Sequence, residues 1–238
     1  MSYIQGFIVA VPTANKQAYH DHAAAALPLF REFGAGRMVE GWGDDVPDGQ
    51  TNDFKGAVLA QDDETVVFSW VEYADRATCD AAGEKMMSDP RMADLGDMPF
   101  DGKRMVWGGF DPVIDMGPGG ATGYVDGYVM PVPAGRKDAF VAMASGAAQV
   151  FLDHGATRVV EAWGDNVADG TVTDFRRATH AKADEVVVFA WVEWPSKAAR
   201  TAGSAGVMAD ERMQSRPADM PFDAGRVTHG GFAPLLDK

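Results

Sequence analysis

Two short motifs in the sequence place a carboxylate close to an indole ring, Glu40-x-Trp42 and Glu161-x-Trp163. A carboxyl group that packs against tryptophan in a dry cleft has a raised pKa, because burial disfavours its charged form. Such a group can donate or accept a proton near neutral pH, as a general acid or base does. Glu40 and Glu161 are therefore the candidate catalytic residues. An alternative stays open, in which each glutamate pairs with an arginine and fixes a contact between two parts of the protein, since structural ion pairs also shift pKa values.

Residues 65–73 alternate between two kinds of side chain, as expected of a β-strand whose faces have different environments. One face carries aromatic residues and Glu72, which suits the space between two sheets, and the other carries smaller residues suited to packing beneath helices. We expect the aromatic face to point, with the two candidate catalytic glutamates, into the interior of a barrel or its mouths. Arg104 and Arg226 begin later strands and could reach these carboxylates. The candidate ligand-binding residues are Trp42, Trp70, Glu72, Arg104, Trp163, Trp191, Glu193 and Arg226.

The chain contains an internal repeat. The stretch Gly41–Phe54, GWGDDVPDGQTNDF, recurs as Ala162–Phe175, AWGDNVADGTVTDF. Matching residues lie 121 positions apart, and one extra residue before Met220 makes this interval 122 near the end of the chain. The chain is therefore one domain written twice. We expect a first repeat over residues 1–116, a flexible glycine-rich linker over 117–123 and a second repeat over 124–238.

Each repeat has the same predicted order of elements. In the first repeat the hydrophobic periodicity predicts strands at 3–11, 38–44, 54–60, 65–73 and 104–110, with helices at 14–33 and 75–88. This order is that of a ferredoxin-like α+β domain, in which two helices cover one face of an antiparallel sheet. Two such sheets can bury their other faces against each other. We therefore expect an α+β fold of two ferredoxin-like repeats, whose antiparallel sheets pack as a pseudo-twofold dimeric α/β barrel in one chain.

Several motifs occur in both halves in the same order: Tyr-x-x-Gly-Phe/Tyr, Glu-x-Trp-Gly-Asp-Asp/Asn-Val, Val-Val-Phe-x-Trp-Val-Glu, Asp-x-Arg-Met and Met-Pro-Phe-Asp. Together they resemble the YbaA-like family of unknown function, which belongs to the dimeric α/β-barrel (ferredoxin-like) group. The resemblance covers nearly the whole of both halves and implies a fused dimer of a domain that usually pairs as a homodimer. It assigns no catalytic residue, because the family has no established activity. Relatives in the wider group include cofactor-free monooxygenases, isomerases, haem-degrading enzymes and ligand-sensing domains.

The composition narrows the classes of partner. A net charge of −14 argues against a nucleic-acid partner, because phosphate binding needs a basic face. No apolar run approaches the roughly 20 residues that span a bilayer, and no signal-peptide pattern precedes the first predicted strand. We therefore expect no membrane partner and a cytoplasmic location. The single cysteine, Cys79, excludes an internal disulfide and fits a reducing compartment.

The sequence also lacks the common signatures of metal and cofactor sites. The acidic loop that contains Asp44, Asp45 and Asp48 does not have the alternating carboxylates and terminal glutamate of a calcium loop. No histidine of one half recurs in the other, so symmetric histidine ligands for a metal are not expected. No glycine-rich dinucleotide fingerprint is present. We expect neither a bound metal nor a tightly held cofactor.

These observations favour a soluble barrel that binds a small molecule, because aromatic side chains with a few carboxylates are typical of ligand sites. As an enzyme, it would carry out proton transfer or cofactor-independent oxidation of an aromatic or carbonyl substrate. The alternative is a non-catalytic structural or interaction protein whose aromatic sheet faces only form the seam between the repeats. A tandem glyoxalase-like metalloenzyme also uses paired repeats, but needs histidine and glutamate ligands that these repeats do not supply. Further homo-oligomerisation is an open alternative.

Overall fold

The computed structural model describes residues 2–120, 122–214 and 219–238. Within these residues, eight antiparallel strands form a closed barrel in the order β1-β3-β2-β8-β5-β7-β6-β4. The strands are β1 (Tyr3–Pro12), β2 (Ala35–Asp45), β3 (Glu64–Tyr73), β4 (Val106–Met116), β5 (Tyr124–Pro133), β6 (Arg158–Val167), β7 (Glu185–Trp194) and β8 (Thr228–Asp237). The predicted fold of two repeats in one α/β barrel is confirmed.

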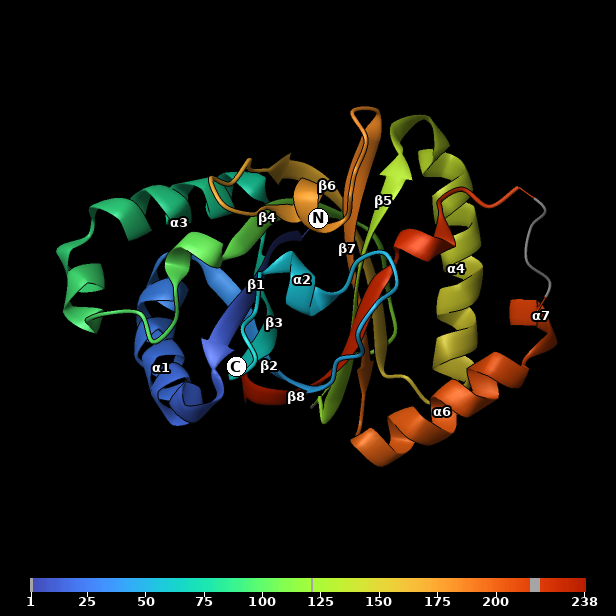
Figure 1. Cartoon of the computed structure of the whole chain (residues 1–238), viewed down its shortest axis with the longest axis horizontal. Coiled ribbons are helices and arrows are strands. Elements are labelled where there is room, and N and C mark those ends of the chain that lie inside the picture. Colours follow the sequence, from blue (N-terminus) through green and yellow to red (C-terminus); the bar gives the residue numbers. More distant parts are fainter. Residues whose placement is uncertain (1, 121, 215–218) are drawn as a thin grey trace.

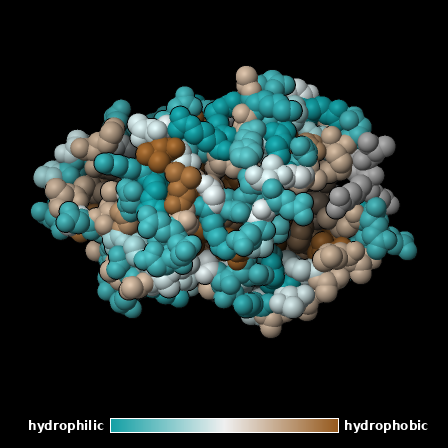
Figure 2. Space-filling view, viewed as in Figure 1, coloured by the Kyte–Doolittle hydropathy of each residue, from teal (hydrophilic) through white to brown (hydrophobic). Residues whose placement is uncertain are grey.

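Helices cover the barrel on two opposite sides (Figure 1). The first repeat supplies α1 and α3 on one side, and the second supplies α4 and α6 on the other (Figure 1). The helices are α1 (Lys16–Glu32), α2 (Phe54–Ala57), α3 (Arg76–Ser88), α4 (Lys137–Asp153), α5 (Phe175–Ala178), α6 (Lys197–Ala209) and α7 (Glu211–Gln214). None of the helices in the described part of the chain is both long enough and apolar enough to cross a membrane. The face in Figure 2 is largely hydrophilic, with a small hydrophobic group left of its centre.

The two repeats share one continuous sheet. Strand β2 of the first repeat pairs with β8 of the second, and β4 pairs with β6 in the same way. Each edge strand of one repeat is thereby hydrogen-bonded to an edge strand of the other, so that the barrel has no open edge. The repeats are joined by backbone pairing as well as by side-chain packing.

The interior of the barrel is filled by aromatic rings that meet across the pseudo-twofold axis. The rings of Phe68 and Phe189 stack with centroids 4.4 Å apart, and those of Trp70 and Trp191 stack at the same distance. Glycine at position 127 makes room for this packing, since a Cβ atom there would lie 3.0 Å from the Phe68 ring. The barrel interior is therefore a packed core.

The segment after the acidic loop differs from the sequence-based expectation. Residues 54–60 were expected to form a short strand, but the chain forms the helical turn α2 there. The Asp53 carboxylate accepts a hydrogen bond from the Gly56 N–H at 2.6 Å, which caps this turn at its start. Phe54, Ala57 and Val58 are all buried at helical spacing. The short apolar run is thus compatible with both structures, and the aspartate cap favours the helix.

Candidate functional site

A largely apolar cavity of about 600 Å³ lies in the first repeat, between the outer face of the sheet and helices α1 and α3. Outward-facing side chains of β1, β2 and β3 form its floor, including Phe7, Glu40 and Ser69. Helix α1 contributes Tyr19, and α3 contributes the single cysteine, Cys79. Exposed lining residues, which include Met87, Met98 and Trp107, lie at its mouth.

Glu40 is buried at the floor of this cavity and is 7% exposed. The Tyr19 hydroxyl donates a hydrogen bond of 2.7 Å to Oε2 of Glu40. Burial raises the pKa of Glu40 to about 7, and hydrogen bonds from Tyr19 and Ser69 partly oppose this rise. Burial and the adjacent carboxylate also raise the pKa of Tyr19, so its hydroxyl stays a hydrogen-bond donor. The Glu40 carboxyl group is therefore about half-protonated near neutral pH, and the Tyr19 hydroxyl bonds it.

The expectation that Glu40 and Trp42 point into the barrel is wrong. Strand β2 directs Val39 and Gly41 inward, and its glutamate and tryptophan lie under the helices instead. The reason is steric: a Cβ atom at position 41 would lie 2.9 Å from Cβ of Phe232, so this position takes the smallest residue. A large side chain on β2 therefore lies on the outer face, although large side chains of β3 face inward.

Trp42 lies beside the cavity in a separate hydrophobic cluster. Its ring packs against Tyr19 at 6.4 Å between centroids, and the Lys16 ammonium lies 5.2 Å from its ring centre. The same arrangement recurs in the second repeat, where Trp163 packs against Phe140 at 6.1 Å and lies beneath Lys137. Both tryptophans hold helices against the outer face of the sheet.

Glu161 is the counterpart of Glu40 and also lies on the outer face, not in the barrel as expected. Its environment differs, because Phe140 replaces the tyrosine and Ala190 replaces the serine found in the first repeat. Its Oε2 atom is buried and has no hydrogen-bond partner among the described residues. Burial alone raises the pKa of Glu161 to about 8.

Trp70, Glu72, Trp191 and Glu193 lie together at one end of the barrel, in a symmetric ion-pair cluster. The Trp191 indole donates to Glu193 at 3.0 Å, and Trp70 donates to Glu72 at 3.1 Å. Each carboxylate also accepts from an arginine of the other repeat: Arg158 bonds Glu72 at 2.7 Å, and Arg37 bonds Glu193 at 2.9 Å. The structure brings these four predicted site residues together, where they link the repeats. Sequence reasoning missed Arg37 and Arg158, although their 121-residue interval marks them as a repeated pair.

The expectation that Arg104 and Arg226 reach the candidate carboxylates is wrong. Arg104 pairs with Glu64 at 2.7 Å, and Arg226 pairs with Glu185 at 2.6 Å. Both arginines lie in short turns before β4 and β8, next to the first residues of β3 and β7. Glu72 is eight residues further along β3, which in an extended strand is roughly 26 Å away.

The repeated acidic loop connects each repeat to the other. The Tyr3 hydroxyl donates to Asp165 at 3.0 Å, and the Tyr124 hydroxyl donates to Asp44 at 2.8 Å. Asn166, the residue after Asp165, lines the cavity of the first repeat. The second repeat therefore supplies part of the wall of the first repeat's cavity, a role that the local sequence pattern did not reveal.

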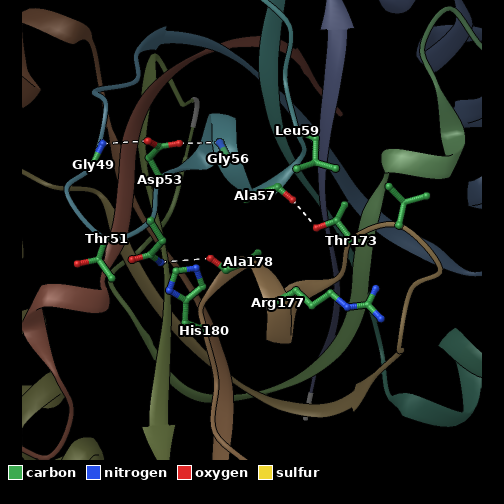
Figure 3. Close-up of a pocket in the computed structure, with 12 residues that line it drawn as sticks. Gly49, Thr51, Asp53, Gly56, Ala57, Leu59, Thr173, Arg177, Ala178 and His180 are labelled. Atoms are coloured by element: carbon green, nitrogen blue, oxygen red, sulfur yellow. Dashed lines mark hydrogen bonds between the residues drawn. The ribbon is translucent and has the colours of Figure 1, made fainter.

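A second cavity, of about 380 Å³, lies at the seam between the two repeats, beside α2 and α5 (Figure 3). Thr173 reaches across it and donates to the Ala57 carbonyl at 2.7 Å (Figure 3). The oxygens of Asp53 accept from the backbone N–H groups of Gly49 and Gly56 (Figure 3). The Asp53 carboxylate is thus engaged in bonds to the backbone of its own loop. The cavity that contains Glu40 is therefore the better candidate for proton transfer.

Histidine, cysteine, aspartate and glutamate side chains do not gather in groups of three suited to a metal ion within residues 2–120, 122–214 and 219–238. The polar side chains that line the candidate cavity include Glu40, Tyr19 and Ser69, together with Gln5, His22, Asp80, Glu84 and Asn166, and Tyr19 already bonds Glu40. Their chemistry is suited to protons and to polar groups of an organic ligand.

The sequence is similar to proteins of a known family. The family model described as "Protein of unknown function (DUF1428)" matches residues 2–102 and again residues 123–224. Over 116 residues the chain is 59% identical to the uncharacterized protein YbaA of Escherichia coli strain K12. That stretch is 48% of this chain and 99% of YbaA.

Solved structures share the fold at low sequence identity. A "putative monooxygenase" from Fusobacterium nucleatum has a TM-score of 0.59 and 9% identity, over 100% of this chain and 94% of that chain. An anthrone oxidase-like protein has a TM-score of 0.54 and 14% identity, over 100% of this chain and 92% of that chain. At these identities the likeness is one of fold.

Proposed function

The chain belongs to the DUF1428 family of proteins of unknown function, and we propose that it binds a small apolar molecule in the first repeat and transfers a proton through Glu40. The observation that carries this proposal is the position of Glu40, a buried carboxyl group with a pKa of about 7 at the floor of an apolar cavity. A general base is most effective when its pKa lies near the working pH. Tyr19 would hold the carboxyl group in place.

The cavity wall supports an aromatic or carbonyl compound as the substrate. Phe7, Phe30, Phe100 and several methionines line the space, and such side chains pack well against flat apolar rings. Glu40 would remove a proton from a carbon next to a carbonyl group and leave an enolate. With dioxygen as the oxidant, a CH2 group would become a carbonyl, and the second oxygen atom would leave as water with the two hydrogens. The fold shared with an anthrone oxidase-like protein is compatible with this reaction.

The first experiment is to find ligands and locate them. A library of neutral aromatic ketones, anthrone and β-diketones would be screened by thermal shift, and hits tested for protection of Cys79 against alkylation at pH 8.5. Cys79 is the single thiol and lines the cavity, so a ligand there should slow its modification. Burial raises the pKa of the thiol to about 11, which makes the unprotected reaction slow enough to follow. A set of hits that leave the alkylation rate unchanged would place binding elsewhere.

The second experiment measures proton transfer directly, as exchange of the hit's acidic C–H for deuterium in D2O. Glu40→Gln should slow this exchange by about 100-fold or more, since general-base catalysis contributes at least that much. Binding of the hit should persist. Glu161→Gln is the matched control, because it removes the counterpart carboxyl from the other repeat, and it should leave the rate within about twofold. Equal losses in both variants would contradict the assignment.

A non-catalytic structural or interaction protein is the second candidate. It is favoured by the barrel interior, where stacked Phe68, Phe189, Trp70 and Trp191 form a seam between the repeats. A library without hits would favour this candidate. A cytoplasmic location is part of both proposals.

A further inference from the structure

The two repeats differ at the positions that line the cavity of the first. Gln5 and Cys79 line this cavity, and their counterparts 121 residues later are Asp126 and Arg200. Two uncharged side chains in the first repeat thus correspond to two oppositely charged side chains in the second. The remaining question is where the charged pair lies.

Asp126 and Arg200 form a partly buried ion pair on the outer face of the second repeat's sheet. The Arg200 Nε atom donates to Asp126 at 2.8 Å, and its guanidinium lies 5.8 Å from the ring centre of Tyr124. The Trp194 indole also donates to Asp126, at 2.9 Å. The first-repeat counterparts of Asp126 and Tyr124, Gln5 and Tyr3, both line the open cavity. In the second repeat the guanidinium therefore lies against the counterparts of two residues that line the cavity in the first.

A third difference between the repeats completes this arrangement. Arg200 also bonds Asp45 of the first repeat, at 3.0 Å. The counterpart of Asp45 is Asn166, which lines the cavity on the side of the first repeat. The aspartate thus faces the repeat that has the arginine, and the neutral asparagine faces the repeat that has the cysteine.

We infer that the Asp126–Arg200 pair closes the second repeat's site, so that the chain binds one apolar ligand, in the first repeat, with the second repeat supplying part of its wall. The inference rests on the proposed function only in taking the first repeat's cavity as the binding site. To admit an apolar molecule, the Arg200 guanidinium would have to leave Asp126. This is unfavourable, because the carboxylate of Asp126 would stay buried without a cation beside it. Binding an apolar molecule in the cavity beside Cys79 does not require such an ion pair to be broken.

The test uses N-phenyl-1-naphthylamine, a neutral aromatic probe that fluoresces when bound in an apolar site. The expected result for the unaltered chain is one molecule bound per chain, with matching protection of Cys79 from alkylation. Two molecules per chain, or no binding, would overturn the inference. Probe binding does not need Glu40 to transfer a proton, so the inference can fail or succeed independently of the proposed catalysis.

Exchanging the pair between the repeats tests its role. Gln5→Asp with Cys79→Arg copies the closed arrangement into the first repeat and should weaken probe binding by about tenfold or more, a change of about 1.4 kcal/mol. Asp126→Gln with Arg200→Cys copies the open arrangement into the second repeat. It should admit a second probe molecule, which then protects the new thiol as well. Circular dichroism and the unfolding midpoint would verify that each variant is folded. Folded variants with unchanged affinity and stoichiometry would remove the pair from this role.

Discussion

The Tyr19 hydroxyl lies 2.7 Å from the carboxylate of Glu40, whereas Phe140 occupies the same position near Glu161 in the second repeat. Ser69, which also bonds Glu40, is replaced by Ala190, so two hydroxyl groups separate the surroundings of the two glutamates. Because a hydrogen bond to a carboxylate favours its charged form, it lowers the pKa. Each repeat is therefore a control for the effect of hydrogen bonding on the pKa of the glutamate in the other.

Tyr19→Phe should raise the pKa of Glu40 above its value of about 7, because the hydrogen bond that now opposes the effect of burial is lost. Phe140→Tyr should lower the pKa of Glu161 below about 8, because it adds the same bond. Carbon-13 NMR titration of the glutamate side chains would measure both values. Shifts in the same direction for the two variants would contradict this account.

The stability of the protein should fall as the pH rises from 5 to 8. In the unfolded chain a glutamate releases its proton near pH 4.3, whereas Glu40 and Glu161 keep theirs up to about pH 7 and 8 when folded. The folded state therefore binds more protons across this range, and each glutamate lowers the free energy of unfolding by about 1.4 kcal/mol per pH unit until its folded pKa is reached. Urea unfolding at pH 5, 6.5 and 8 would measure the slope. Glu161→Gln should flatten it, and parallel slopes for variant and parent would contradict the prediction.

Gly127→Ala should destabilise the barrel by about 1–3 kcal/mol, because an added methyl group overpacks a filled core. The new Cβ atom would lie 3.0 Å from the rings of Phe68 and Phe232. Gly146→Ala is the control, since this exposed glycine lies within α4 and a Cβ atom there meets nothing within 4 Å. It should stabilise the helix by about 0.5–1 kcal/mol. Equal effects of the two substitutions, measured by urea unfolding, would show that the ring packing does not constrain position 127.

Arg37→Met should lower the free energy of unfolding by about 3–5 kcal/mol, because it leaves a buried carboxylate without its closest cation. That carboxylate belongs to Glu193, which is 0% exposed and bonds Arg37 at 2.9 Å. In the double variant with Glu193→Gln, much of the loss should be recovered, since the fully buried carboxylate is gone and Asp237, the other carboxylate that bonds Arg37, is partly exposed to water. Arg91→Met is the matched control, because this half-exposed arginine pairs with Glu32 and Asp89 at the surface. A comparable loss for the control would argue against a special role of the buried cluster.

Sequence reasoning predicted much of the fold, since each element depends on local periodicity. The alternation in residues 65–73 predicted β3, and its inward aromatic face is confirmed by the stack of Trp70 on Trp191. The repeat, together with the order of elements within it, predicted the pseudo-twofold barrel. The helical turn α2 was missed because a short apolar run fits a strand and a helix equally well.

The position of the candidate site depends on contacts between residues that are far apart in the sequence. Glu40 was identified from its neighbour Trp42, but the cavity that contains it is on the opposite face of the sheet from the one expected. The face was decided by Phe232, a residue 191 positions after Gly41 that leaves no room for a side chain there.

By itself, the sequence determined that one domain occurs twice, what most of its elements are and which residues recur, because repetition and periodicity are properties of the order of residues. Only the tertiary structure decided that Arg37 meets Glu193, that Asn166 lines the other repeat's cavity and that Arg200 pairs with Asp126. These contacts join residues far apart in the chain. They depend on how the strands of the two repeats pair to close the barrel, because this pairing decides which side chains lie close enough to meet.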